Sequence, residues 1–178
     1  KQQLRANLLS RVLLDNSASP LRKELETCGL GTGPSQLCGL EDSNKEMTFV
    51  CGLEGAEITD SQAFETLVLN CLEKVASEGV PQSEIEAALH QLELGQREIG
   101  GDGYPFGMQL ILSALPAAIH GGDALAALNL DPVWSQLAED IKDRNLIPDL
   151  MQDLLINNSH QVRLTQVPDE HMTNRRDV

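Results

Sequence analysis

The sequence predicts an α+β fold in which helices pack on one face of a small antiparallel sheet. Long stretches repeat apolar residues every three or four positions, as amphipathic helices do, whereas residues 35–53 alternate around a polar turn like a hairpin. Residues 161–167 alternate again. A hairpin and one distant strand make a marginal sheet, because three or more strands with helix cover are usual. We therefore expect a sheet that is truncated on its N-terminal side.

The chain is expected to form one folded unit over residues 1–168, followed by the start of a linker at 169–178. A chain of about 150 residues buries roughly 70% of its unfolded surface, so this chain of 178 residues is long enough for a real core. Lys1 already lies in a helical pattern, and the tail after Pro168 is polar. We interpret both ends as those of a piece of a longer protein.

The first helix is predicted from an apolar stripe formed by Leu4, Leu8, Leu9, Val12 and Leu13. A second helix begins after Ser19, a favoured N-cap, and Pro20 suits the first helical position, where no amide donor is needed. Leu21 opens its apolar face. Gly29 or Gly31 then ends this helix in a left-handed conformation.

The hairpin is predicted as strands at 35–40 and 46–53, joined by the turn-forming residues 41–45. Alternation in the second strand gives it one apolar face, which consists of Met47, Phe49, Cys51 and Leu53. We expect that face to be buried.

The strongest helix of the chain is predicted to open with a capping box of Thr59 and Gln62 and to close at Gly79. Its wide apolar stripe consists of Phe64, Leu67, Val68, Cys71, Leu72 and Val75. Another helix runs from about Ser83 until the glycine-rich residues 100–103 break it.

Short helices are expected in the second half of the chain. Residues 108–130 are apolar and alanine-rich, and Pro116 and the pair Gly121–Gly122 are expected to divide them. The Asp-Pro pair at 131–132 would cap the next helix, and apolar residues at 147–155 supply the last one.

Composition argues against two classes of partner. The formal net charge is -14, from 13 Lys and Arg against 27 Asp and Glu, whereas nucleic acids and anionic membranes require a concentrated positive surface. No stretch approaches the roughly 20 apolar residues of a membrane span. Acidity of this size is more typical of a self-repelling surface than of a specific cation site.

Four cysteines, Cys28, Cys38, Cys51 and Cys71, follow no C-x-x-C spacing of a zinc knuckle or redox pair. Each lies on an apolar stripe or strand face, so we interpret them as buried free thiols in a reducing compartment. The alternative, a thiol hydrolase, requires a reactive cysteine that is alkylated rapidly at neutral pH.

The most suggestive chemical motif is the run from His90 to Leu94, since an inverted zinc-peptidase motif is H-x-x-E-H on a helix. Glu93 fits the pattern, but Leu94 stands where the second histidine ligand is needed. The competing interpretation is an exposed polar row of Glu86, His90 and Glu93, with Arg97 forming an ion pair one turn beyond Glu93. No metal ligand and no catalytic residue are assigned.

Two other motifs carry no chemistry on this interpretation. The glycine-rich run 29–33 follows a helix and precedes a strand, the reverse of a phosphate-binding turn, so a helix exit is expected there. Ser19, Cys28 and the histidines are not assigned to a triad, because triad partners are recognised by geometry.

His120 and Asp123 form a polar island inside the apolar region 108–130. One interpretation is a helix end at which Asp123 caps the following helix. The other is a contact between these two side chains and a bound peptide.

Five segments together resemble the second domain of the presequence-protease branch of the pitrilysin and insulinase-like zinc metallopeptidases. They occur in the same order with similar spacing and span nearly the whole chain: SASPLRKELETCGLGTG at 17–33, TFVCGLEGAE at 48–57, ALHQLELGQRE at 88–98, AAIHGGDALAALN at 117–129 and LLINNSHQVRLTQVPDE at 154–170.

This resemblance implies a protease of four homologous domains in two halves that close around a chamber. Zinc and its ligands belong to the first domain of that family, where the metal polarises the scissile carbonyl and a Glu activates water. The present chain would be a non-catalytic domain that binds no zinc itself and forms part of the chamber wall. Its partners would be the catalytic domain and the C-terminal half of the same polypeptide, together with peptide substrates.

The expected location is the cytoplasm in a bacterium or an organelle matrix in a eukaryote. An alternative from another class is an acidic, helix-rich interaction module without enzymatic activity, which recruits a partner through the Ala/Leu surface of 108–130. That surface would have to be large and contiguous.

Overall fold

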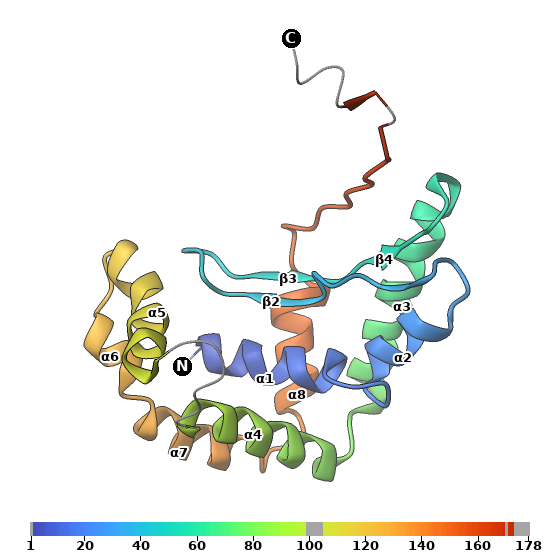
Figure 1. Cartoon of the computed structure of the whole chain (residues 1–178). Coiled ribbons are helices and arrows are strands. Elements are labelled where there is room, and N and C mark those ends of the chain that lie inside the picture. Colours follow the sequence, from blue (N-terminus) through green and yellow to red (C-terminus); the bar gives the residue numbers. More distant parts are fainter. Residues whose placement is uncertain (1, 99–104, 170, 173–178) are drawn as a thin grey trace.

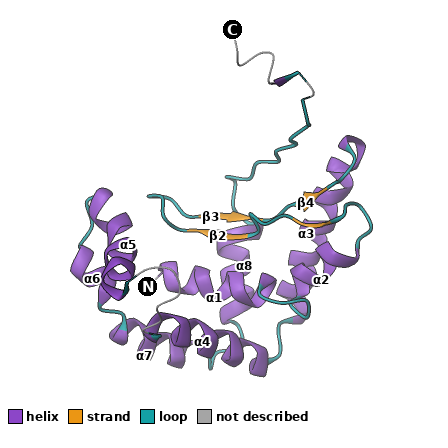
Figure 2. Ribbon diagram, in the orientation of Figure 1, coloured by secondary structure: helices purple, strands orange, loops and turns teal. Residues whose placement is uncertain are grey.

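A computed structural model describes residues 2–98, 105–169 and 171–172, in which helices dominate (Figures 1 and 2). The helices are α1 (Gln2–Leu14), α2 (Pro20–Thr27), α3 (Ser61–Glu78), α4 (Gln82–Arg97), α5 (Phe106–Ile119), α6 (Ala124–Leu128), α7 (Asp131–Asp140) and α8 (Leu146–Met151). The strands are β1 (Gly33–Pro34), β2 (Gly39–Glu41), β3 (Thr48–Val50) and β4 (Leu53–Glu54). A 3-10 turn, η1 (Ile58–Asp60), precedes α3, and a π-helical turn, η2 (Gln152–Ile156), continues α8. The predicted break at 100–103 lies outside the described residues.

The predicted hairpin is confirmed, but its strands are shorter than expected and are interrupted. β2 pairs antiparallel with β3, with Leu40 opposite Phe49, and β1 pairs antiparallel with β4, with Pro34 opposite Leu53. Between the two ladders, residues 35–38 face only residues 51–52. The first strand therefore has a bulge of two extra residues. Because side chains alternate between the two faces of a sheet, an even number of extra residues keeps the side chains after the bulge on the same faces as before it.

Helices cover one face of this hairpin, as predicted. In Figure 1, β2 and β3 cross over α1 and α8, while α4 and α7 lie farther from the strands. The covered face contributes partly buried side chains to the core, namely Cys38, Phe49, Cys51 and Leu53. The fold class is thus α+β with a small antiparallel sheet.

Helix α1 lies at the centre of the core. It packs against α2, α4, α8 and β2. The most completely buried side chains come from α1, α2 and α8: Leu8, Leu9, Leu13, Leu21, Leu25, Ile147 and Met151. The predicted stripes of α3 and α4 join the same core through Val68, Cys71, Leu72, Val75, Ile85, Leu89 and Leu92. No helix among the described residues is long and apolar enough to cross a membrane.

The start of α2 follows the predicted pattern except at one hydrogen bond. Ser19 occupies the N-cap position and Pro20 the first turn, and Leu21 is fully buried. The Ser19 side chain does not bond a helix amide; its Oγ accepts from the Asn16 backbone N–H at 3.4 Å. Ser19 therefore closes the preceding turn rather than capping α2 through its hydroxyl.

The two glycines after α2 have different roles. Gly29 has φ +70°, the left-handed conformation that was predicted to end the helix. Gly31 does not have a positive φ. It is required by close approach, because a Cβ at this position would lie 2.7 Å from the backbone oxygen of Glu54.

Two predictions about helix starts are wrong in detail. The capping box does not form, because Asp60 is the N-cap of α3 and the Gln62 side chain instead accepts a hydrogen bond from Arg163 at 2.7 Å. Asp131 does not cap α7 either: Leu130 is at the N-cap, and the Asp131 carboxylate accepts from Arg97 at 2.9 Å. In both cases an arginine that is distant in sequence donates a hydrogen bond to the side chain that was predicted to cap the helix.

Two further predictions differ from the structure. Pro116 lies inside α5 rather than dividing it, since a proline so near a helix end removes one hydrogen bond only; the division falls at Gly121, with φ +76°. Residues 161–167 form no strand within the described part of the chain and are exposed throughout. An extended segment becomes a strand only by pairing with a neighbour, and none of the described strands pairs with it.

We predict that Gly31→Ala destabilises the protein by about 1–3 kcal/mol, because the new methyl group would displace the Glu54 backbone in β4. Gly33→Ala is the matched control, since nothing lies within 4 Å of a Cβ there and its φ is not positive. Urea denaturation of both variants measures the difference. Equal stability of the two variants would contradict the close packing of β4 on the exit from α2.

Candidate functional site

The H-x-x-E run lies on an exposed face of α4. His90 is exposed, Glu93 is half-buried, and Leu94 is 51% exposed. The Arg97 Nε donates to the Glu93 carboxylate at 2.8 Å, which is the predicted ion pair, and the second Arg97 nitrogen, Nη2, donates to Asp131. The carboxylates beside Arg97 raise its pKa above the ordinary value. Glu93 is thus engaged by a cation of its own helix.

These residues do not fit a zinc site. A zinc ion needs at least three protein ligands, and an alkyl group at Leu94 supplies none. Within residues 2–98, 105–169 and 171–172 there is no group of three or more His, Cys, Asp or Glu side chains arranged to hold a metal. No chemical step is therefore derived from a metal bound to this segment.

The corner between α5 and α6 brings His120 and Asp123 together at one end of a helical pair. The Asp123 carboxylate is the N-cap of α6 and accepts from the backbone N–H groups of Leu125 at 2.9 Å and Ala126 at 3.1 Å. The His120 Nε2 lies 3.3 Å from the carbonyl oxygen of Ser43, in the turn of the hairpin. Both side chains thus have structural partners, while their contact with a peptide stays a prediction.

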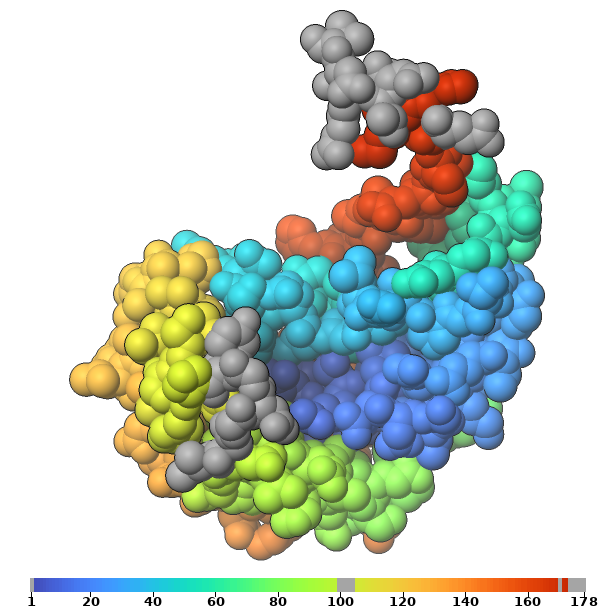
Figure 3. Space-filling model, viewed as in Figure 1, coloured from blue at the N-terminus to red at the C-terminus, as the bar shows by residue number. Residues whose placement is uncertain are grey.

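Helices α5 and α6 pack against each other and have no fully buried side chain. They lie at one edge of the molecule and are coloured yellow and orange in Figure 3. We call residues 106–128 the apolar arm. The Ala/Leu surface predicted at residues 108–130 is therefore exposed along most of its length.

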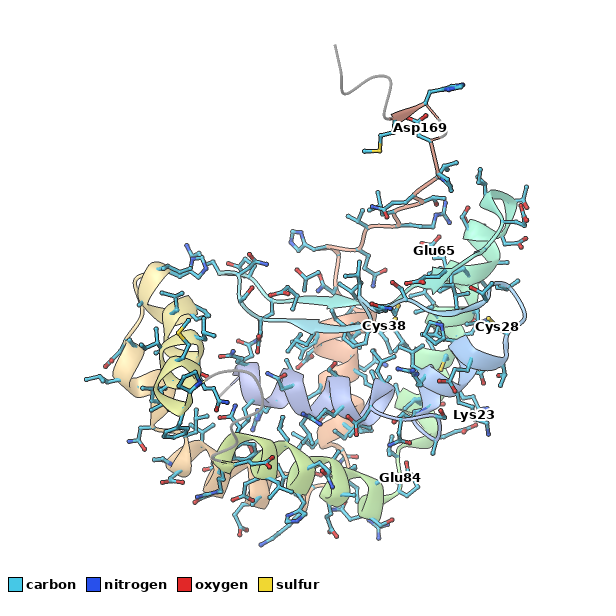
Figure 4. All side chains as sticks on the ribbon, in the orientation of Figure 1. Lys23, Cys28, Cys38, Glu65, Glu84 and Asp169 are labelled. Atoms are coloured by element: carbon cyan, nitrogen blue, oxygen red, sulfur yellow. The ribbon has the colours of Figure 1, made fainter. Side chains whose placement is uncertain are left out.

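All four cysteines are free thiols, but only one of them is fully buried as predicted; Cys28, Cys38 and Cys51 are partly buried. Cys71 is buried in α3, and Figure 4 shows Cys28 at the end of α2, away from Cys38 on the hairpin. Burial, together with the neighbouring Cys38 and Cys71, raises the pKa of the Cys51 thiol to about 12. Burial and the nearby Glu24 raise the pKa of Cys71 to about 11. A nucleophilic cysteine needs a lowered pKa, so neither thiol suits the hydrolase alternative.

An open hollow of about 570 Å³ runs along α3, which the sequence did not predict. Its lining comes from α3 and one residue of α2: Glu24, Gln62, Ala63, Thr66, Leu67, Asn70, Cys71 and Lys74. The extended segment after η2 is tied to the start of α3, since Arg163 donates hydrogen bonds to the side chains of Gln62 and Glu65. No local sequence motif indicates this hollow. Its lining residues on α3 are spaced about one helical turn apart, and they form a hollow only because α2 packs alongside α3.

Comparison with known proteins identifies relatives along the whole chain. No protein-family model matches. The chain is 31% identical, over 99% of its length, to presequence protease 1, chloroplastic/mitochondrial, of Arabidopsis thaliana. It is 29% identical over 86% of its length to the mitochondrial presequence protease of Yarrowia lipolytica, and 25% identical over 96% to Protein HypA of Clostridium perfringens.

The chain is therefore homologous to a segment of a peptidase. The particular relatives include the presequence proteases, so the predicted resemblance to presequence proteases is confirmed. The chain spans only 15% to 17% of the length of these relatives.

We predict that Asp123→Ala frays α6, because two backbone donors lose their acceptor at a cost of about 1 kcal/mol. Amide hydrogen exchange at Leu125 and Ala126 would accelerate roughly fivefold. Asp123→Asn is the control, since asparagine caps as well as aspartate does. If Asn accelerated exchange as much as Ala, the carboxylate charge rather than the cap would be what matters.

We predict slow alkylation of Cys51 and Cys71 by iodoacetamide in the folded protein at pH 8, where their raised pKa values keep both thiols neutral. Denaturation should restore fast labelling, followed by mass spectrometry. The same shifts predict a pH dependence: the stability contributed by the two thiols is present below pH 9, their ordinary pKa, and is lost as the pH rises through 11 to 12. Rapid native labelling of either thiol would contradict its raised pKa.

Proposed function

We propose that this chain is the non-catalytic second domain of a zinc metalloendopeptidase that degrades unfolded peptides inside a closed chamber. One observation carries the proposal: 99% of the chain aligns with a presequence protease of which it spans 16%. In this proposal the domain packs beside the catalytic domain and forms part of the chamber wall. Its other partners are the C-terminal half of the same polypeptide and the peptide substrates.

The chemistry of α4 supports a non-catalytic role for this segment. His90 and Glu93 preserve half of an inverted zinc motif, but Leu94 and the Arg97 ion pair leave no metal-binding set. We propose that zinc is held by residues outside this segment. The domain would then contribute surface and shape, with the corner at His120 and Asp123 as a peptide contact.

The names of the relatives support a location. Relatives are called mitochondrial, or chloroplastic and mitochondrial, and a bacterial relative also aligns over 96% of the chain. We propose an organelle matrix for the protein if it is eukaryotic and the cytoplasm if it is bacterial.

The exposure of the apolar arm favours a second candidate, an acidic interaction module that recruits a separate protein. Nine of the sixteen exposed large apolar side chains among the described residues lie in this arm. The reading frame upstream of Lys1 distinguishes the two candidates. An H-x-x-E-H motif there supports the peptidase, whereas a start codon shortly before Lys1 supports the module.

We predict that the protein expressed from its complete reading frame hydrolyses an unstructured fluorogenic peptide, and that a chelator abolishes this activity. His90→Ala should change kcat/KM by less than about twofold, because His90 lies outside the proposed metal site. Alanine at the first His of an upstream H-x-x-E-H motif is the matched comparison and should lose metal and activity. Loss of bound zinc in His90→Ala would refute the non-catalytic role of this segment.

A further inference from the structure

The apolar arm stands apart from the rest of the described structure. α5 packs extensively against α6, and no other described element makes a comparable contact with it. A hydrogen bond between His120 and Ser43 joins its corner to the hairpin. Figure 1 shows the pair of helices rising beside the hairpin at one edge of the molecule.

Apolar side chains surround the arm rather than lining one side of it. Leu110, Ile111 and Leu112 are consecutive and all exposed, and successive residues of a helix point about 100° apart. One stripe cannot contain all three. A helix that is apolar all round is normally buried, so this arm needs a partner that encloses it.

The arm is also nearly free of charge in a chain whose net charge is -14. Residues 106–128 contain one Asp or Glu, Asp123, whose carboxylate is occupied by the α6 cap, and no Lys or Arg. Charged residues are depleted at the cores of interfaces, and permanent interfaces are more apolar than transient ones. The composition of the arm therefore matches a permanent, apolar contact.

We infer that the apolar faces of α5 and α6 in the apolar arm insert into an apolar groove on another domain of the same polypeptide, outside these 178 residues, and that the corner at His120 and Asp123 stays outside this groove. This inference rests on the proposed function, in which the chain is one domain of a protein about six times longer, as its relatives are. The large remaining length supplies the enclosing surface. Insertion would anchor this domain to its neighbour through α5 and α6.

Two other occupants fit the geometry less well. A second copy of the arm, paired by a two-fold axis, would cover one side of each arm and leave the opposite side in water. A peptide substrate would leave the whole arm exposed whenever the chamber is empty. Only a groove that is always present buries Ile111 together with its neighbours on both sides.

The test measures accessibility in the protein expressed from its complete reading frame. Ile111→Cys (61% exposed here) and Leu125→Cys (77% exposed) are compared with the matched controls Ile58→Cys (59%) and Leu37→Cys (76%), which lie outside the arm. Iodoacetamide labelling of each position in the native protein is followed by mass spectrometry. The two arm positions should react at least about tenfold more slowly than the controls, at every protein concentration.

Arm positions that react as fast as the controls would overturn the inference. Protection that grows with protein concentration would assign the arm to a second copy, and protection that appears only on adding an unstructured peptide would assign it to substrate; either result overturns the inference too. Chelator-sensitive peptide hydrolysis is measured on the same preparations. Active protein with a reactive arm leaves the proposed function standing and removes only the insertion.

Discussion

The burial of α1 on nearly every side is the constraint on which the rest of the structure depends. Eight of its thirteen residues are buried, including Leu8 and Leu9 side by side, whereas an ordinary surface helix buries a single stripe. Helices α2, α4 and α8 and strand β2 must therefore all be present to cover it. The ion pair between Arg5 and Asp140 adds a tie from α1 to α7.

This arrangement separates a body from an appendage. The hairpin, α3, α4 and α8 all contribute to the one core, and Gly31 allows β4 to lie directly against the exit from α2. The apolar arm contributes no residue to that core. The domain therefore consists of a body with its own core and an arm whose apolar side chains lie outside that core.

The sequence predicted those features that depend on neighbouring residues. Periodicity located the buried faces of α1, α3 and α4, and Pro20 and Gly29 marked the ends of α2. It failed where a residue distant in sequence decides the outcome. Arg163 and Arg97 engage Gln62 and Asp131, which short-range rules assign to caps. The two-residue bulge of the hairpin and the hollow along α3 likewise depend on how distant elements pack together. The H-x-x-E run resembles a zinc motif but has Leu94 in place of the second histidine ligand.

The central place of α1 also sets when the domain can be completed. Within this segment α1 is synthesised before α8, which covers it and begins only at Leu146. To bring such distant segments into contact, the chain must first lose the conformational entropy of loop closure. Burial of apolar surface compensates for that loss only afterwards, and this slows folding. At 5–20 residues per second, the leucine-rich first helix waits for roughly ten seconds during translation without its cover. During that interval α1 exposes apolar side chains to which a chaperone can bind.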